Sequence, residues 1–134
     1  MANEATLVQR LEDRLFTVKV ADGTALTKGT ILAFSTDANT AVASSADGDL
    51  FAGILAEDKV ANDGQTQVSV WRKGVFAVKV GGTQTATMGN KLKIVGANLV
   101  GDGDATTLAD MSEHFAIALE AGASNETIQV LLTG

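Results

Sequence analysis

The chain has 134 residues, a formal net charge of −6, and neither cysteine nor proline. The absence of cysteine excludes disulfides, thiolate catalysis and cysteine-based zinc sites. The acidity argues against nucleic acid and anionic membrane as partners, because binding to phosphate needs clustered Lys and Arg.

The first 14 residues are predicted to form an arm or a short helix. Leu7, Val8, Leu11 and Leu15 repeat at helical spacing, with charged residues on the other faces. The segment lacks the basic and apolar regions of a signal peptide, so we expect a protein that stays in the cytosol or leaves it inside an assembly.

From Leu15 onward, short alternating runs are separated by Gly, Asp, Asn and Thr, a pattern typical of an all-β sandwich or barrel. The turns are expected at Asp22-Gly23, Asp47-Gly48, Asp63-Gly64 and Gly81-Gly82. The expected strands are 15–20, 30–34, 50–56, 66–72, 75–80, 91–95, 115–120 and 127–132.

One further short helix is expected after Asp104, since Leu108, Met111 and Phe115 repeat at helical spacing. The predicted fold is therefore mainly β, a small barrel with at most one or two short helices. Residues 15–134 are expected to form one β domain. Only five Phe and one Trp supply bulk to its core, so association with copies or a partner is expected.

The chain resembles itself at a distance of about sixty residues. The string at 27–29 aligns with 87–89, and Val68, Val70 and Gly74 align with Ile128, Val130 and Gly134. Between these anchors the segment 51–57 aligns with 115–121 at an offset of 64. We interpret this as a duplication that gives two related halves, at about 15–80 and 81–134. The alternative is that any two hairpins rich in Ala and Val look alike.

No residue pattern predicts catalysis. The single histidine, His114, stands at the start of an expected strand, and Ser112 is too near in sequence to form a nucleophile and base with it. We therefore expect no catalytic residues and no enzyme activity.

Two acidic pairs, Asp47-Gly48-Asp49 and Asp102-Gly103-Asp104, raise the possibility of a calcium site. The other oxygen ligands of a calcium loop are missing at the required spacing, and Asp-Gly is a common turn pair. Gly96, Gly101 and Gly103 are assigned to a polar loop without a phosphate-binding pattern. No metal and no cofactor are expected.

Trp71 is expected on the strand face opposite Val68 and Val70. It is either a core residue on a second face or an exposed anchor at a protein interface, where Trp is enriched.

A family resemblance appears at Phe51-Ala52-Gly53-Ile54-Leu55-Ala56 and at the run from Thr66 to Phe76. These strings resemble the lambda-type head decoration proteins, in which a Gly-Ile-Leu-Ala strand precedes an alternating strand ending in Lys-Gly-x-Phe. The segments 115–121 and 128–132 are similar to the closing motif of a broader group of phage capsid cement proteins. Together the matches cover about half of the chain.

The resemblance implies a β-tulip-like domain that forms a homotrimer on the major capsid protein and stabilises an expanded head against internal DNA pressure. It implies a place on the outer capsid surface of the virion, after assembly in the host cytoplasm. Capsid binding is assigned to the N-terminal segment, at Ala2, Asn3, Glu4, Thr6, Leu7, Val8, Leu11 and Arg14. Trimer contact is assigned to Trp71, Arg72, Asp47, Asp49 and Asp102.

Two other functions remain open. The first is a different β-structured virion part, such as a head fibre base or a tail tube protein. The second is a β barrel that binds a small ligand or carbohydrate, which would need aromatic and polar groups converging in a pocket.

Overall fold

The computed structural model describes residues 15–103 and 113–133. The prediction of a mainly β fold is confirmed: ten strands and no helix make up the elements of this part. The predicted helices over 4–15 and after Asp104 lie mostly outside the described residues: of the first only Leu15 is described, and it begins β1, and of the second only residues 113–115 are described. The strands are β1 Leu15–Lys19, β2 Ile31–Phe34, β3 Ala41–Ala43, β4 Phe51–Leu55, β5 Gln67–Trp71, β6 Gly74–Val80, β7 Lys91–Gly96, β8 Leu99–Asp102, β9 Ala116–Ala118 and β10 Thr127–Leu132.

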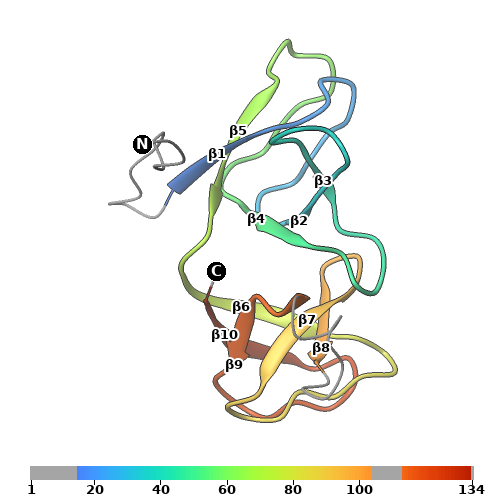
Figure 1. The fold of residues 1–134 in the computed structure, drawn as a ribbon, viewed down its shortest axis with the longest axis vertical. Coiled ribbons are helices and arrows are strands. Elements are labelled where there is room, and N and C mark those ends of the chain that lie inside the picture. The colour runs from blue at the N-terminus through green and yellow to red at the C-terminus, as the bar shows by residue number, and fades with distance from the viewer. Residues whose placement is uncertain (1–14, 104–112, 134) are drawn as a thin grey trace, which may run out of the picture.

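The strands form two units, one above the other in Figure 1. The first unit is a five-stranded sheet with the order β1-β5-β4-β2-β3, and the second unit is a closed barrel with the order β10-β6-β8-β7-β9. The chain passes from the first unit to the second between Trp71 and Gly74. Strand β6 therefore belongs to the second sheet, whereas the sequence analysis divided its two halves after residue 80.

The two units share one pairing scheme. Leu15 lies opposite Trp71 in the first unit, and Val75 lies opposite Leu131 in the second, sixty residues further along. The parallel pairing of Lys79 with Leu99, which closes the barrel, has a counterpart in the single bridge between Lys19 and Thr40. The first unit is thus an incompletely closed form of the same barrel. The same pairing thus recurs sixty residues apart, while its origin in a duplication stays a prediction.

A bulge shifts the offset of the repeat by one residue within β4. In the first unit β2 skips a residue of β4: Leu32 pairs with Gly53, whereas Ala33 pairs with Phe51. In the second unit Leu92 pairs with Ala116, and the Phe115 amide donates to the Leu92 carbonyl. The offset of 64 therefore holds at Phe51, while Gly53 corresponds to Ala116 at an offset of 63.

Two strands were not predicted. Strand β3 has only three residues, Ala-Val-Ala, and is too short and too small to show an alternating pattern. Strand β8 contains Gly101 and Asp102, which have low strand propensity. The assignment of Gly96 and Gly101 to a polar loop is wrong, because these glycines lie in β7 and β8. The predicted strand 115–120 is shorter than expected, being β9.

The core consists of two clusters. The smaller lies within the first unit and includes Val18, Leu32 and Val70. The larger fills the barrel and also takes in Ile31, Phe51 and Ile54 from the first unit. Part of the first unit is thus buried against the second, so the two units share a core.

Candidate interaction surfaces

Polar contacts from β2 and from the connection between β3 and β4 hold the two units together. The Asn98 side-chain oxygen accepts a hydrogen bond from the Ile31 amide at 2.8 Å, and the Asn98 amide donates to Ser44 Oγ at 3.1 Å. The Gly48 amide donates to the Ile94 carbonyl at 3.1 Å. These bonds run from the first unit to β7 and to the turn after it, so the loop fixes one unit against the other.

Aromatic contacts reinforce this junction. The rings of Phe51 and Phe115, which are counterparts in the repeat, stack with centroids 4.4 Å apart. The Arg72 guanidinium lies 5.4 Å from the Phe51 ring centre and 5.8 Å from that of Phe16. Burial lowers the pKa of Arg72, but an arginine still carries its charge at neutral pH. Arg72 therefore contributes cation–π contacts where the chain crosses between the units.

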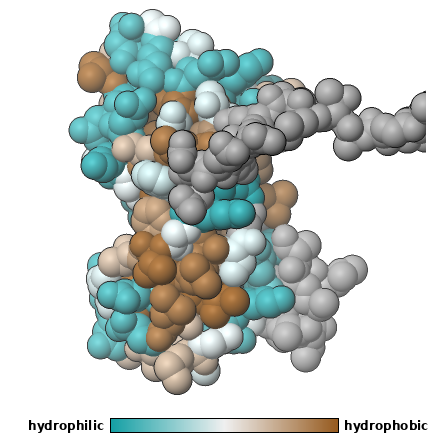
Figure 2. All heavy atoms as spheres, turned by 90° about the vertical axis from the view of Figure 1, so that its left-hand side faces the viewer, coloured by the Kyte–Doolittle hydropathy of each residue, from teal (hydrophilic) through white to brown (hydrophobic). Residues whose placement is uncertain are grey.

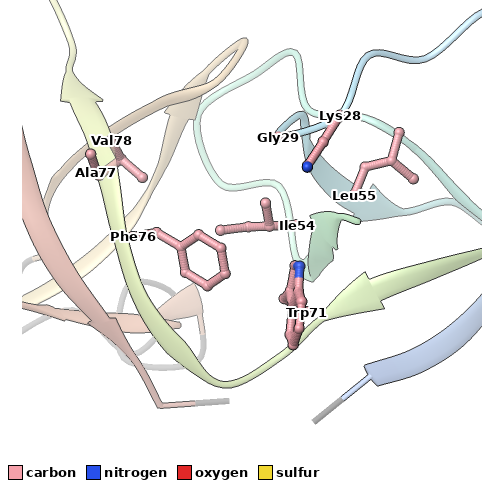
Figure 3. A pocket seen from close by; sticks show the side chains of 8 residues that line it. All are labelled: Lys28, Gly29, Ile54, Leu55, Trp71, Phe76, Ala77 and Val78. Atoms are coloured by element: carbon pink, nitrogen blue, oxygen red, sulfur yellow. The ribbon is translucent and has the colours of Figure 1, made fainter. Parts of the chain in front are cut away.

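A groove of about 370 Å³ opens between the units on the side of this crossing. Figure 3 shows the side chains of Ile54, Trp71 and Phe76 around the space, with the Lys28 amine also directed toward it. The groove is lined by Lys28, Gly29, Ile54, Leu55, Trp71, Phe76, Ala77 and Val78. This lining suits an apolar group and offers a single cation, an arrangement for binding rather than for acid–base chemistry.

A buried lysine, Lys59, orders the other end of the first unit and was not predicted from the sequence. The Lys59 amine donates to the carbonyls of Asp22 and Val60 at 2.9 Å and contacts the carboxylates of Asp22 and Asp63 at 3.2 and 3.1 Å. Its side chain is fully buried. In sequence it stands in an ordinary polar turn, and the only signal was the pair of Asp-Gly turns that supply its acceptors.

The pKa shifts at this site follow from the contacts. Removal from water would lower the pKa of Lys59, but the hydrogen bonds and charges of Asp63 and Asp22 outweigh it and hold that pKa above its ordinary 10.5. The hydrogen bond from the Gln65 amide, followed by that from Lys59, holds the pKa of Asp63 below its ordinary 3.8. Each group therefore favours the charged state of the other.

The sequence matches no protein-family model and no curated protein. The fold is similar to the crystal structure of the head fiber gp8.5 N base of bacteriophage phi29. The TM-score is 0.56 at 17% identity, and the match covers 89% of this chain and 92% of that chain. The likeness to the phi29 base shows that the architecture of both units together, not of one barrel alone, recurs in another protein.

The structure does not bring the residues assigned to trimer contact into one patch. Trp71 lines the groove and packs against the larger core cluster, which favours the second-face core interpretation. Arg72 lies over aromatic rings. Asp47 forms an ion pair with Lys93 of β7 at 3.0 Å. Their contact with another copy stays a prediction.

The other acidic residues assigned to trimer contact have local partners. Asp49 accepts hydrogen bonds from the Ser45 and Ala46 amides at 2.9 and 3.1 Å. Asp102 accepts from the amide and the hydroxyl of Thr87 at 2.9 and 2.8 Å. Asp49 thus orders the turn that contains Asp47-Gly48, whereas Asp102 lies in β8 and bonds to Thr87, fifteen residues away in the chain. Within residues 15–103 and 113–133, no group of three or more His, Asp or Glu residues is placed to hold a metal ion.

His114 packs against the backbone of Gly103, and its Nε2 atom has no hydrogen-bond partner. The residues assigned to capsid binding, from Ala2 to Arg14, lie outside the described part of the chain. Within the described part, no helix is both long and apolar enough to cross a bilayer.

Proposed function

We propose that this protein is a non-catalytic structural component attached to the outside of a tailed-phage-type head, built like a head fibre base. The observation that carries the proposal is the two-unit fold shared with the phi29 head fiber base over about nine-tenths of both chains. Matching both units and their junction is a stronger constraint than matching one small barrel, since small barrels host many functions.

The decoration role is the second candidate. It is favoured by the strings at 51–56 and 66–76, which resemble those of head decoration proteins. A cement protein and a fibre base both need a rigid body that binds repeated sites on a lattice. The contacts between the units, Phe51 on Phe115 and Asn98 to Ile31, supply such rigidity.

In either role we propose the major capsid protein as the partner and the outer capsid surface as the location, with a homotrimer as the bound form. We assign capsid contact to residues 2–14. Their apolar stripe is suited to a segment that becomes ordered when it binds, or that adds a strand to a sheet of the coat protein.

The proposal is tested by co-sedimentation of the purified protein with expanded and unexpanded heads of the virus that encodes it. Saturable binding to heads with a fixed number of copies per shell is expected, with density at three-fold positions in an image reconstruction. Absence of binding to either form of head would refute the proposal. A variant lacking residues 2–14 tests the arm separately, since unchanged binding would remove only that assignment.

A heating experiment separates the two roles. Heads depleted of the protein are heated beside heads to which it has been restored, and the release of DNA is followed with a dye. A cement protein raises the temperature at which the heads release DNA. A fibre base that does not stabilise the shell leaves this temperature unchanged. Assembly of the free protein into tubes would instead favour a tail tube component, and saturable binding of a sugar would favour a carbohydrate-binding barrel.

A further inference from the structure

The groove between the two units offers hydrogen-bond donors and no side-chain acceptor. Among its lining residues only Lys28 and Trp71 carry polar side-chain atoms, the amine nitrogen and the indole nitrogen. Figure 3 shows both nitrogen atoms directed into the space beside Ile54. An ammonium group and an indole N–H donate hydrogen bonds and accept none. An occupant of the groove must therefore bring the acceptor.

Neither donor is used within the part of the chain that the structure describes. The ion pairs of this part involve Lys59 and Lys93, not the Lys28 amine. Asp58 lies nearby, but its carboxylate accepts a hydrogen bond from the Lys28 backbone amide, at 2.6 Å. The Trp71 indole nitrogen has no acceptor among these residues either. A carboxylate from outside the chain would receive both bonds, and bonds to a charged acceptor are the stronger ones.

The walls of the groove are apolar and rigid. Ile54 and Val78 are 3% and 7% exposed and belong to the larger core cluster, against which Trp71 and Phe76 pack. The volume of about 370 Å³ is near the lower limit of pockets that hold small ligands, about 300–1,000 Å³. The groove therefore suits a short segment that presents one large apolar side chain beside its carboxylate.

The groove adjoins the place where the segment assigned to capsid binding joins the body. Leu15 lies opposite Trp71 in the strand register, so residues 2–14 end next to a residue pair that includes one wall of the groove. A coat-protein surface held by that segment would lie beside the groove. This continuity favours the coat protein as the source of the occupant.

The charge of the chain favours the same source. With a net charge of −6, two copies repel each other, and a broadly acidic partner surface would be repelled as well. Lys28 supplies one cation inside an apolar groove that has no acidic lining residue. The groove is therefore suited to a mainly apolar segment with a single carboxylate.

Apolar surface continues beyond the groove. Figure 2 presents the side of the molecule on which the chain crosses between the units, and hydrophobic atoms gather there over the second unit. Val75 and Leu131, which lie opposite each other just after the crossing, are 55% and 39% exposed. A partner segment that leaves the groove on this side would meet further apolar surface.

We propose that this groove binds a segment of the coat protein in which an Asp or Glu stands next to a large apolar residue. The carboxylate accepts hydrogen bonds from the Lys28 amine and the Trp71 indole, and the apolar side chain packs on Ile54 and Phe76. The inference rests on the proposed attachment to a head, and it adds a second contact to the one assigned to residues 2–14.

Co-sedimentation with heads of the virus that encodes the chain measures the contribution of the cation. Lys28→Gln removes the charge and should raise the dissociation constant about tenfold or more, as expected for a lost hydrogen bond to a charged group. Its matched control is Lys19→Gln, at an exposed lysine of β1 outside the groove. The difference between the natural chain and Lys28→Gln should shrink in high salt.

A bulky side chain placed in the groove tests the apolar part. Ala77→Trp should weaken binding to heads more than Lys28→Gln does, because the new ring fills the space. Ala43→Trp, at an exposed alanine of β3 outside the groove, is the control. Thermal unfolding of each variant shows whether the fold is retained.

These outcomes separate the groove from the proposed function. If the natural chain binds heads, and Lys28→Gln and Ala77→Trp bind them equally well, the inference is wrong and the attachment to heads stands. Equal weakening by Lys28→Gln and its Lys19→Gln control would also overturn the inference. If the natural chain does not bind heads, the proposed function fails and the inference fails with it.

The fluorescence of Trp71 reports directly on the groove, because Trp71 is the only tryptophan of the chain. The natural chain is titrated with overlapping peptides that cover the coat protein, with Phe in place of any Trp. A peptide with Asp or Glu beside a large apolar residue should shift the Trp71 emission to shorter wavelengths, saturably. The same peptide with the carboxylate replaced by its amide should bind about tenfold more weakly.

Three results of this titration would overturn the inference. The first is equal binding of the peptide and its amide counterpart, and the second is no response to any peptide. The third is a shift that grows with the concentration of the protein alone, which would show that a second copy fills the groove.

Discussion

The two units have the same strand pairing but are completed in different ways. The second closes into a barrel through Lys79 and Val80 on β8 and turns back after β9 at Gly122. The first is closed by a single bridge, and at the position equivalent to Gly122 it carries Lys59, held by two carboxylates and two carbonyls. The backbone hydrogen bonds therefore define the unit, while either apolar packing or a buried charge can complete it.

The largest effect is expected at the shared core. Phe115→Ala should lower the free energy of unfolding by about 4 kcal/mol, because Phe115 is 1% exposed and its loss leaves a cavity. Denaturant unfolding measures the change. Phe51→Ala should cost less, about 3 kcal/mol, and the double variant should fall short of the sum by about 1 kcal/mol because the rings stack. Strict additivity would show that the units are energetically independent.

Substitutions at the equivalent positions Gly53 and Ala116 should lower the free energy of unfolding by different amounts. Gly53 has φ of +150°, and an added Cβ would come within 2.5 Å of a Val70 methyl group, so Gly53→Ala should cost about 3 kcal/mol. Its counterpart Ala116 lies in the strand without the bulge, and Ala116→Gly should cost only about 1 kcal/mol. Chemical denaturation of both variants checks the difference. Equal costs would mean that the bulge does not constrain the first unit.

The ion pairs of the buried Lys59 should make the stability of the first unit depend on pH. The pKa of Asp63 is lowered by folding, so its stabilising effect is present above pH 3.8 and is lost as the pH falls through the folded-state value. The pKa of Lys59 is raised, so its effect is present below pH 10.5 and is lost as the pH rises through the folded-state value.

Thermal unfolding from pH 2 to 12 measures both limits. Asp63→Asn should reduce stability at neutral pH and flatten the acidic limb, while Lys59→Met should flatten the alkaline limb. Glu126→Gln, in the corresponding turn of the second unit, serves as the comparison for acid sensitivity unrelated to Lys59. An alkaline limb unchanged in Lys59→Met would exclude the lysine as its source.

The smallest effect is expected at the ion pair between Asp47 and Lys93. The Asp47 side chain is 60% exposed, so solvent screens the pair, and Asp47→Asn should cost less than about 0.5 kcal/mol. The difference from the natural chain should vanish in high salt. A larger loss would show that Asp47 positions the whole loop between β3 and β4.

The sequence predicted the strands whose side chains alternate and whose ends are marked by turns, such as β5 and β10. It also located the repeat, because Phe51 and Phe115 are bulky and recognisable in an Ala-rich chain. It could not place β3 or β8, since these are defined by partners distant in the chain and not by their own residues. The junction between the units was equally hidden: nothing local in Asn98 or Asp47 indicates which residue it meets.

The residues predicted to contact another copy show a related limit of the sequence. Trp71 and Arg72 lie where the two units meet, and their contact with another copy stays a prediction. A sequence pattern indicates that an apolar or aromatic residue is buried in a contact. It does not show whether the contact is made by the same chain or by another one.

The crossing between the units has a mechanical consequence. Leu15, where the described chain starts, is paired with Trp71 just before the crossing, and Leu132, near its other end, is paired with Gly74 just after it. Both ends therefore leave from one side of the molecule, as Figure 1 shows. Tension applied between them would open β1 from β5 and β10 from β6 one residue pair at a time. The force needed to separate the terminal strands is therefore expected to be small, since it acts on one residue pair at a time.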